Sequence, residues 1–164
     1  MAETVEKKVA DLAGKYLTFK LLNEEYGIEI LKVREIIGVM AITSLPRTPP
    51  FVRGVINLRG KVIPVIELRR KFEMDAAEDT DQTCIIVVDV TIQGGNIQIG
   101  ILVDSVSEVL DILGADIEDA PAFGTNIDTA FILGMAKAKG SVKILLNIEK
   151  VLSTTELENV AGMV

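Results

Sequence analysis

The chain has 164 residues, is 49% hydrophobic and carries a net charge of −7, so it can bury a sizeable core but offers no basic surface for nucleic acid. The absence of histidine and the single cysteine exclude a structural zinc site, a histidine general base and an internal disulfide. No apolar run approaches about 18 residues, and the charged residues 1–14 do not fit a signal peptide, so we expect a cytoplasmic protein without membrane insertion, metal or cofactor.

The first half of the chain is predicted to form short β-strands, because runs rich in valine and isoleucine alternate with turn-forming residues. The five runs cover residues 15–22, 26–31, 34–40, 53–58 and 61–67. Pro64 has no N–H group to donate, which predicts that the last of these strands lies at an edge or carries a bulge. The segment TPPFVRG, closed by Gly54, predicts one helical turn.

The second half repeats this pattern after an acidic connection, residues 73–82. Its five predicted strands cover residues 83–92, 96–103, 106–112, 131–137 and 141–147. Cys84 lies in the apolar run CIIVV and is expected to be a small core side chain rather than a reactive thiol. Ser153 and Glu156 have the spacing of a capping box, which predicts a short C-terminal helix.

The two halves are related by an internal repeat. YGIEILKVREII (residues 26–37) aligns with IGILVDSVSEVL (99–110), and FVRGVINLRGKVIPVIELRRKF (51–72) aligns with FILGMAKAKGSVKILLNIEKVL (131–152). Three glycines of the first copy, Gly27, Gly54 and Gly60, fall on Gly100, Gly134 and Gly140. These pairs indicate a duplication, and the last pair suits the positive φ of a tight hairpin turn.

The repeat also aligns charges and apolar positions. Glu35 and Arg59 fall on Glu108 and Lys139, which predicts an acid–base pair in each copy. Period-two spacing predicts ten core side chains. They are Ile28, Ile30, Ile36, Val55, Val62, Val65, Val87, Ile101, Val103 and Leu145.

Three runs, YGIEILKVREI, GVINLRGKVIPVIEL and GILVDSVSEVL, together resemble the CheW family, the coupling proteins of bacterial chemotaxis. The resemblance covers about residues 15–152. It implies an all-β fold of two five-stranded, SH3-like or OB-like β-barrel lobes, with strands that can be exchanged between lobes. We therefore expect a single CheW-like domain over residues 1–164, with lobe 1 at about 15–72, the connection at 73–82, lobe 2 at about 83–152 and a short C-terminal helix.

The resemblance also implies a function. CheW-like proteins are noncatalytic adaptors that couple the cytoplasmic tips of chemoreceptors, the methyl-accepting chemotaxis proteins, to the histidine kinase CheA. The regulatory domain of that kinase itself resembles CheW. A receptor helix docks in an apolar groove between the lobes, and the kinase pairs with the end of a barrel. This chain would then be recruited to membrane receptor clusters from the cytoplasm.

Seven residues are assigned to the receptor-binding surface on this basis, whereas the kinase-binding residues stay unassigned. They are Val33, Glu35, Gly54, Asn57, Arg59, Gly100 and Val106. For the two valines the competing interpretation is core packing, for the two glycines a backbone role, and for Asn57 a turn position. For the charged pair it is two solvated side chains whose interaction contributes about 0–1 kcal/mol.

Three other functions compete with this assignment. An adaptor of a non-chemotaxis receptor–kinase pathway would have the same sequence features. An aspartic-protease-like enzyme needs two carboxylates sharing a proton, but the nearest motif, Asp128-Thr129-Ala130, lacks glycine and has no counterpart in the first copy. A module that reads proline-rich peptides needs an aromatic groove, and the chain has two tyrosines, five phenylalanines and no tryptophan.

Overall fold

The structure is a computed structural model that describes residues 12–75, 78–92, 95–119 and 131–162. The first half contains β1 (Gly14–Leu21), β2 (Glu24–Glu29), the 3-10 turn η3 (Ile30–Lys32), β3 (Val33–Gly38), β4 (Val52–Leu58), β5 (Lys61–Glu67) and α1 (Leu68–Lys71). The second contains β6 (Cys84–Ile92), β7 (Gly95–Val103), β8 (Ser105–Ile112), η4 (Gly114–Asp116), β9 (Ile117–Glu118), β10 (Ile132–Ala138), β11 (Ser141–Leu146), η6 (Ile148–Lys150) and α2 (Thr154–Ala161).

All ten predicted strands are present, and the C-terminal helix α2 begins at the predicted capping box. The Ser153 hydroxyl accepts a hydrogen bond from the Glu156 N–H, and the Glu156 carboxylate accepts one from the Ser153 N–H. The helical turn predicted before Gly54 is wrong, because this segment forms no helix. It makes one hydrogen-bonded turn, in which the Val52 N–H donates to the Pro49 carbonyl, and Gly54 lies within β4 rather than at the end of a helix. Strand β9 and the one-turn helix α1 were not predicted.

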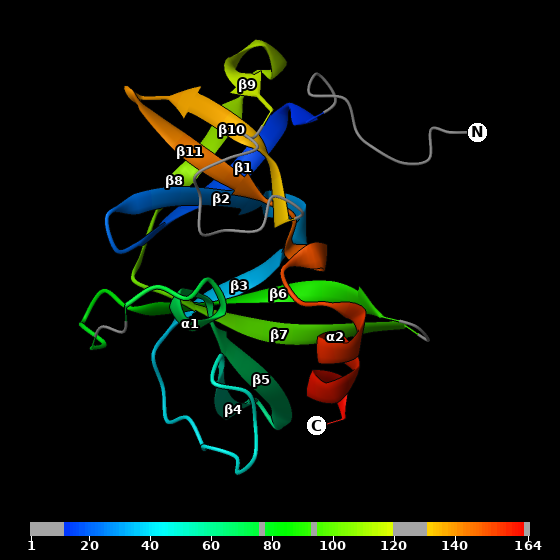
Figure 1. Ribbon diagram of the computed structural model, residues 1–164. Coiled ribbons are helices and arrows are strands. Elements are labelled where there is room, and N and C mark those ends of the chain that lie inside the picture. The colour runs from blue at the N-terminus through cyan, green and yellow to red at the C-terminus, as the bar shows by residue number, and fades with distance from the viewer. Residues whose placement is uncertain (1–11, 76–77, 93–94, 120–130, 163–164) are drawn as a thin grey trace.

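The strands form two sheets, one above the other in Figure 1. The six-stranded lobe has the order β8-β1-β2-β11-β10-β9, and the five-stranded lobe has the order β3-β6-β7-β5-β4. Each lobe therefore takes a hairpin from the other half of the chain: β1–β2 joins the six-stranded lobe, and β6–β7 joins the five-stranded lobe. Neither lobe corresponds to a contiguous stretch such as 15–72 or 83–152.

The exchanged hairpins are held by two equivalent parallel contacts. In the six-stranded lobe β2 runs beside β11, with Gly27 opposite Leu145. In the five-stranded lobe β7 runs beside β5, with Gly100 opposite Val65. The repeat aligns Gly27 with Gly100 and Val65 with Leu145. The two parallel strand pairings, β2–β11 and β7–β5, are therefore equivalent in the two copies of the duplicated unit.

Two expectations about the sheets need correction. The lobes are not closed barrels, because within the described residues the outer strands of each sheet do not pair with one another. Pro64 is not on an edge strand, since β5 lies between β7 and β4. The proline is tolerated there because the parallel ladder to β7 begins only at the next residue, Val65. The other predicted alternative, a bulge, occurs in the β4–β5 ladder, where the register shifts between Val52 and Gly54 of β4.

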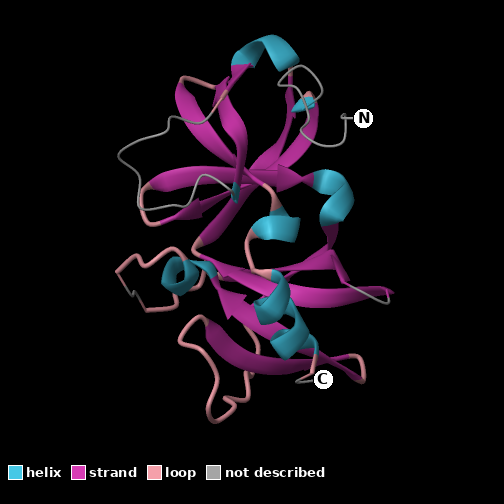
Figure 2. Cartoon of the chain, turned by 45° about the vertical axis from the view of Figure 1, so that its right-hand side comes forward, coloured by secondary structure: helices cyan, strands magenta, loops and turns pink. Residues whose placement is uncertain are grey.

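One hydrophobic core joins the two lobes. It contains side chains of β1 and β2 from one sheet, of β6 and β7 from the other, and Leu157 and Val160 of α2. Figure 2 shows α2 lying along the five-stranded lobe. Among the ten predicted core residues, six are buried and Ile30 and Val55 are half-buried, but Ile36 and Val62 are exposed.

Candidate functional site

The predicted acid–base pairs are formed in both lobes. Arg59 makes an ion pair with Glu35, and the Lys139 Nζ atom lies 3.2 Å from a carboxylate oxygen of Glu108. In each lobe the acid lies on an outer strand, β3 or β8, and the base lies at the tip of the β4–β5 or β10–β11 hairpin. Each pair therefore joins an end strand of its sheet to a hairpin that is not its neighbour in the strand order.

The hairpin tips have the same backbone conformation. Arg59 and Gly60 have φ values of 53° and 86°, and Lys139 and Gly140 have φ values of 51° and 83°. Positive φ at both central residues is typical of a type I′ turn, which matches the twist of the flanking strands. Asn57 supports the first turn, because its side-chain oxygen accepts a hydrogen bond of 2.8 Å from the Gly60 N–H.

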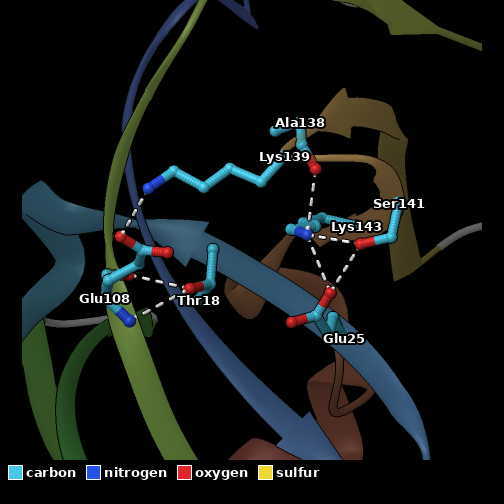
Figure 3. Close-up of polar contacts among 7 residues, drawn as sticks. All are labelled: Thr18, Glu25, Glu108, Ala138, Lys139, Ser141 and Lys143. Carbon is cyan, nitrogen blue, oxygen red and sulfur yellow. Dashed lines mark hydrogen bonds and ion pairs between the residues drawn. The ribbon is translucent and has the colours of Figure 1, made fainter.

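The six-stranded lobe carries additional polar contacts beside its pair (Figure 3). The Thr18 hydroxyl donates to the Glu108 carbonyl at 2.8 Å and accepts from the Glu108 N–H at 3.2 Å. The buried Lys143 ammonium donates to Glu25 at 2.7 Å and to Ser141 at 2.6 Å. These donors hold the pKa of Glu25 below its usual value, chiefly through the Lys143 hydrogen bond.

The two glycines assigned to the receptor surface lie inside the five-stranded lobe. A Cβ atom on Gly54 would collide with the Thr43 carbonyl, where Thr43 and Val55 exchange two backbone hydrogen bonds of 2.9 Å. A Cβ atom on Gly100 would lie 2.7 Å from the Ile85 Cγ2 atom. Both contacts favour the backbone role of these glycines.

The seven assigned residues do not form one site. Val33 and Val106 are half-buried and pack against the shared core, at equivalent places in the two copies. Glu35, Asn57 and Arg59 gather at the tip of the β4–β5 hairpin. The structure thus divides the predicted set into two core-packed valines, a polar hairpin tip and two interior glycines.

An apolar hollow of about 290 Å³ lies where the chain leaves β2 for η3. Its lining residues, which define what we call the η3 hollow, are Leu12, Ala13, Gly14, Lys15, Tyr16, Glu29, Ile30 and Leu31. Leu31 is 93% exposed. One feature of the sequence points to this position: the repeat aligns Leu31 with Asp104, so an apolar side chain occupies a position that is charged in the other copy.

Tyr16 forms the buried wall of the η3 hollow. Its hydroxyl donates to the Leu12 carbonyl at 2.7 Å. Burial, together with the negative charge of Glu29, raises the pKa of Tyr16 to about 12. The phenol is therefore a fixed neutral donor, and the hollow offers a ligand mainly apolar contacts.

A second kind of apolar surface is repeated on both lobes. Ile36 and Val62 of the five-stranded lobe are 42% and 45% exposed. Their repeat partners in the six-stranded lobe, Val109 and Val142, are 48% and 49% exposed. Both copies therefore leave the same two positions uncovered, and these side chains mark equivalent exposed apolar positions on the two lobes.

The described residues contain no cluster of three or more His, Cys, Asp or Glu side chains that could hold a metal ion. No helix in the described part of the chain is long and apolar enough to cross a membrane. The Asp128-Thr129-Ala130 motif of the enzyme alternative lies outside the described residues. The surfaces that the structure does describe are apolar contact areas.

The comparisons with known proteins agree on one family. The family model of the CheW-like domain matches residues 15–156. The chemotaxis protein CheW of Klebsiella aerogenes is 40% identical over 162 residues, covering 96% of this chain and 95% of the relative. That of Treponema pallidum is 31% identical over 161 residues, covering 97% and 94%.

A solved structure supports the same assignment. The scaffolding protein TtCheW from Thermoanaerobacter tengcongensis superimposes with a TM-score of 0.77 at 37% sequence identity, covering 87% of this chain and 89% of that protein. The match covers most of both chains. With its duplicated two-lobe β fold and these relatives, the chain belongs to the CheW family of chemotaxis coupling adaptors.

Proposed function

We propose that this chain is a noncatalytic cytoplasmic adaptor that couples the cytoplasmic tip of a chemoreceptor to the regulatory domain of a CheA-type histidine kinase. The observation that carries the proposal is the presence of two kinds of apolar surface at separate places. One is the η3 hollow, which occurs once. The other is the pair of exposed apolar side chains that occurs on both lobes. A coupling protein needs two surfaces that can be occupied together.

The receptor is assigned to the η3 hollow. An amphipathic helix docks by placing an apolar stripe in a groove, and Ile30 and Leu31 supply the apolar wall. Lys15 and Glu29 give the hollow charged lining groups that can meet polar residues of the helix. Val33 follows η3 directly, and so it stays in the proposed receptor surface.

The kinase is assigned to the exposed apolar side chains that are repeated on both lobes. Ile36 and Val62 offer such a surface on the five-stranded lobe, and Val109 and Val142 offer its equivalent on the other lobe. Because the kinase domain resembles CheW, it carries the corresponding positions, and apolar patches of like shape can pack against each other. Glu35 and Arg59 are kept apart from this surface as a proposed part of the receptor surface, because Glu35 points to the other face of β3 from Ile36.

The first experiment is a calorimetric titration of the protein with the CheA regulatory domain from the same source. We expect saturable binding that is weakened by Ile36→Ser and unchanged by Leu31→Ser. Titration with the receptor tip should give the opposite pattern, with a loss of about tenfold or more for Leu31→Ser, because a leucine contact is removed.

Leu113→Ser is the matched control, since Leu113 is also an exposed leucine, at 64%, but lies outside both surfaces. No binding between a folded wild-type protein and its matched kinase domain would overturn the kinase assignment. Equal effects of Leu31→Ser and Leu113→Ser on the receptor titration would overturn the receptor assignment.

A further inference from the structure

The two lobes are connected by two polar clusters, and the first is centred on Asp104. This residue lies in the crossover from β7 in the five-stranded lobe to β8 in the six-stranded lobe. Its carboxylate makes an ion pair of 2.7 Å with the Arg69 Nε atom in α1 and accepts a hydrogen bond of 2.6 Å from the Leu22 N–H. We call this group of three residues the Asp104 cluster.

The second cluster is centred on Glu149 of η6. One carboxylate oxygen makes an ion pair of 2.8 Å with Lys32 Nζ, and the other accepts a hydrogen bond of 3.2 Å from the Thr91 N–H. Lys32 lies in η3, the crossover from β2 in the six-stranded lobe to β3 in the five-stranded lobe. This group of three residues is the Glu149 cluster.

The internal repeat relates the two clusters to each other. Arg69 and Glu149 are both the second residue of the helical turn that follows β5 or β11, and the repeat aligns them. In each cluster a side chain of that turn meets a charged residue of a crossover, and the carboxylate accepts an N–H from the end of an exchanged hairpin. The positions of the acid and the base are reversed: the acid lies on the crossover in the Asp104 cluster and on the helical turn in the Glu149 cluster.

The clusters differ in burial. In the Asp104 cluster the Arg69 and Asp104 side chains are 2% and 25% exposed. In the Glu149 cluster the Lys32 and Glu149 side chains are 35% and 26% exposed. A buried pair cannot separate without leaving an uncompensated charge, whereas a partly exposed pair can open and be solvated, and salt weakens it.

The weaker cluster is next to the η3 hollow. Lys32 is the last residue of η3, and the two residues before it, Ile30 and Leu31, line the hollow. The η3 turn is held locally by the Val33 N–H, which donates to the Ile30 carbonyl. The Lys32–Glu149 pair therefore anchors one wall of the hollow to the part of the chain between β11 and α2.

From this geometry we infer that Lys32 and Glu149 are positioning residues of the η3 hollow. They hold η3 so that Ile30 and Leu31 face a bound helix. When the Lys32–Glu149 ion pair breaks, the η3 turn becomes more mobile. The identity of the ligand as a receptor tip rests on the proposed function. The positioning itself can be tested without any ligand.

The test uses Lys32→Gln, which removes the charge, and Lys32→Arg, which retains it. Hydrogen exchange of the Val33 amide reports on η3, and calorimetric titration with the receptor tip reports on the hollow. We expect Lys32→Gln to speed the exchange and weaken tip binding by about three- to fivefold each, with both values restored in Lys32→Arg. High salt should reproduce the faster exchange in the wild-type protein but add nothing in Lys32→Gln.

Lys137→Gln is the control, since it removes an exposed ion pair with Glu118 in the same lobe, away from the hollow. Unchanged Val33 exchange in Lys32→Gln, or the same exchange in Lys32→Arg and Lys32→Gln, would overturn the inference. Faster exchange with unaltered tip affinity would overturn the link to the hollow. If the wild-type protein does not bind the tip, the proposed receptor assignment fails, and the exchange results still decide the positioning role.

Discussion

Arg59 and Lys139 occupy the same place at the tips of two equivalent hairpins, and each makes an ion pair with a glutamate on the opposite end of its sheet. Both have a left-handed backbone conformation, with φ values of 53° and 51°. The first pair uses a guanidinium group, which presents a planar set of donors, and the second uses a point-like ammonium group. The duplicated unit has thus kept the contact while changing its chemistry.

Replacing Arg59 should separate binding from stability. We predict that Arg59→Ala weakens coupling to the receptor and leaves the melting temperature nearly unchanged, because the exposed pair contributes at most about 1 kcal/mol. Calorimetric titration with the receptor tip and thermal unfolding would measure the two effects. Lys139→Ala is the matched control in the other lobe. A large loss of stability in Arg59→Ala would instead give Arg59 a structural role.

Gly54 should tolerate no side chain. Its φ of 149° and the position of the Thr43 carbonyl mean that Gly54→Ala combines backbone strain with a collision against fixed backbone. We predict a loss of more than about 3 kcal/mol in the free energy of unfolding, measured with urea. Gly60→Ala should cost only about 1 kcal/mol, since Gly60 also has a positive φ but open space around it. Similar losses in the two variants would contradict this account.

Gly100→Asp should damage the fold of the five-stranded lobe. The new side chain would meet Ile85 and Val65 and bury a carboxylate between β6 and β5. The expected loss is at least about 2 kcal/mol, seen as a lower urea midpoint. Gly38→Asp is the control, because Gly38 is exposed and has nothing near its Cβ position. A normal urea midpoint in Gly100→Asp would contradict this interpretation.

Glu25 should make stability depend on pH. Its pKa in the folded protein is lowered, chiefly by the hydrogen bond from Lys143, so its contribution to stability is fully present above the unfolded value of about 4.5. That contribution is lost as the pH falls through the lower folded pKa. Glu25→Gln removes the charge and leaves the buried Lys143 without its counter-ion, which should cost roughly 3 kcal/mol at pH 7.

Urea unfolding of the wild-type protein and Glu25→Gln between pH 7 and pH 3 would test this. The stability difference between the two proteins should shrink as the pH falls below about 4.5. A difference that stays constant over this range would show that Glu25 does not act through its charge.

The sequence predicted the strands and both ion pairs, because period-two patterns and the repeat are local signals. It placed Ile36 and Val62 in the core, and this was wrong. Alternation shows which residues share a face of a strand but not whether that face is covered. The exchange of hairpins could not be derived from the same patterns, since a hairpin has the same sequence whichever sheet it joins.

The candidate site was harder to predict than the fold. Gly54 and Gly100 were correctly singled out as constrained positions, but only the contacts with Thr43 and Ile85 show that the constraint is internal. The η3 hollow was missed because Leu31 lies in a three-residue turn, too short to have a periodic pattern. The two-residue strand β9 was missed for the same reason.

The exchange of hairpins also sets the order in which the protein can be completed during synthesis. The five-stranded lobe has all of its strands once Val103 has left the ribosome. The β1–β2 hairpin is made first, yet its neighbours β8 and β11 are among the last strands to emerge. The β1–β2 hairpin must therefore keep its unpaired strand edges out of wrong contacts until β8 and then β11 are available.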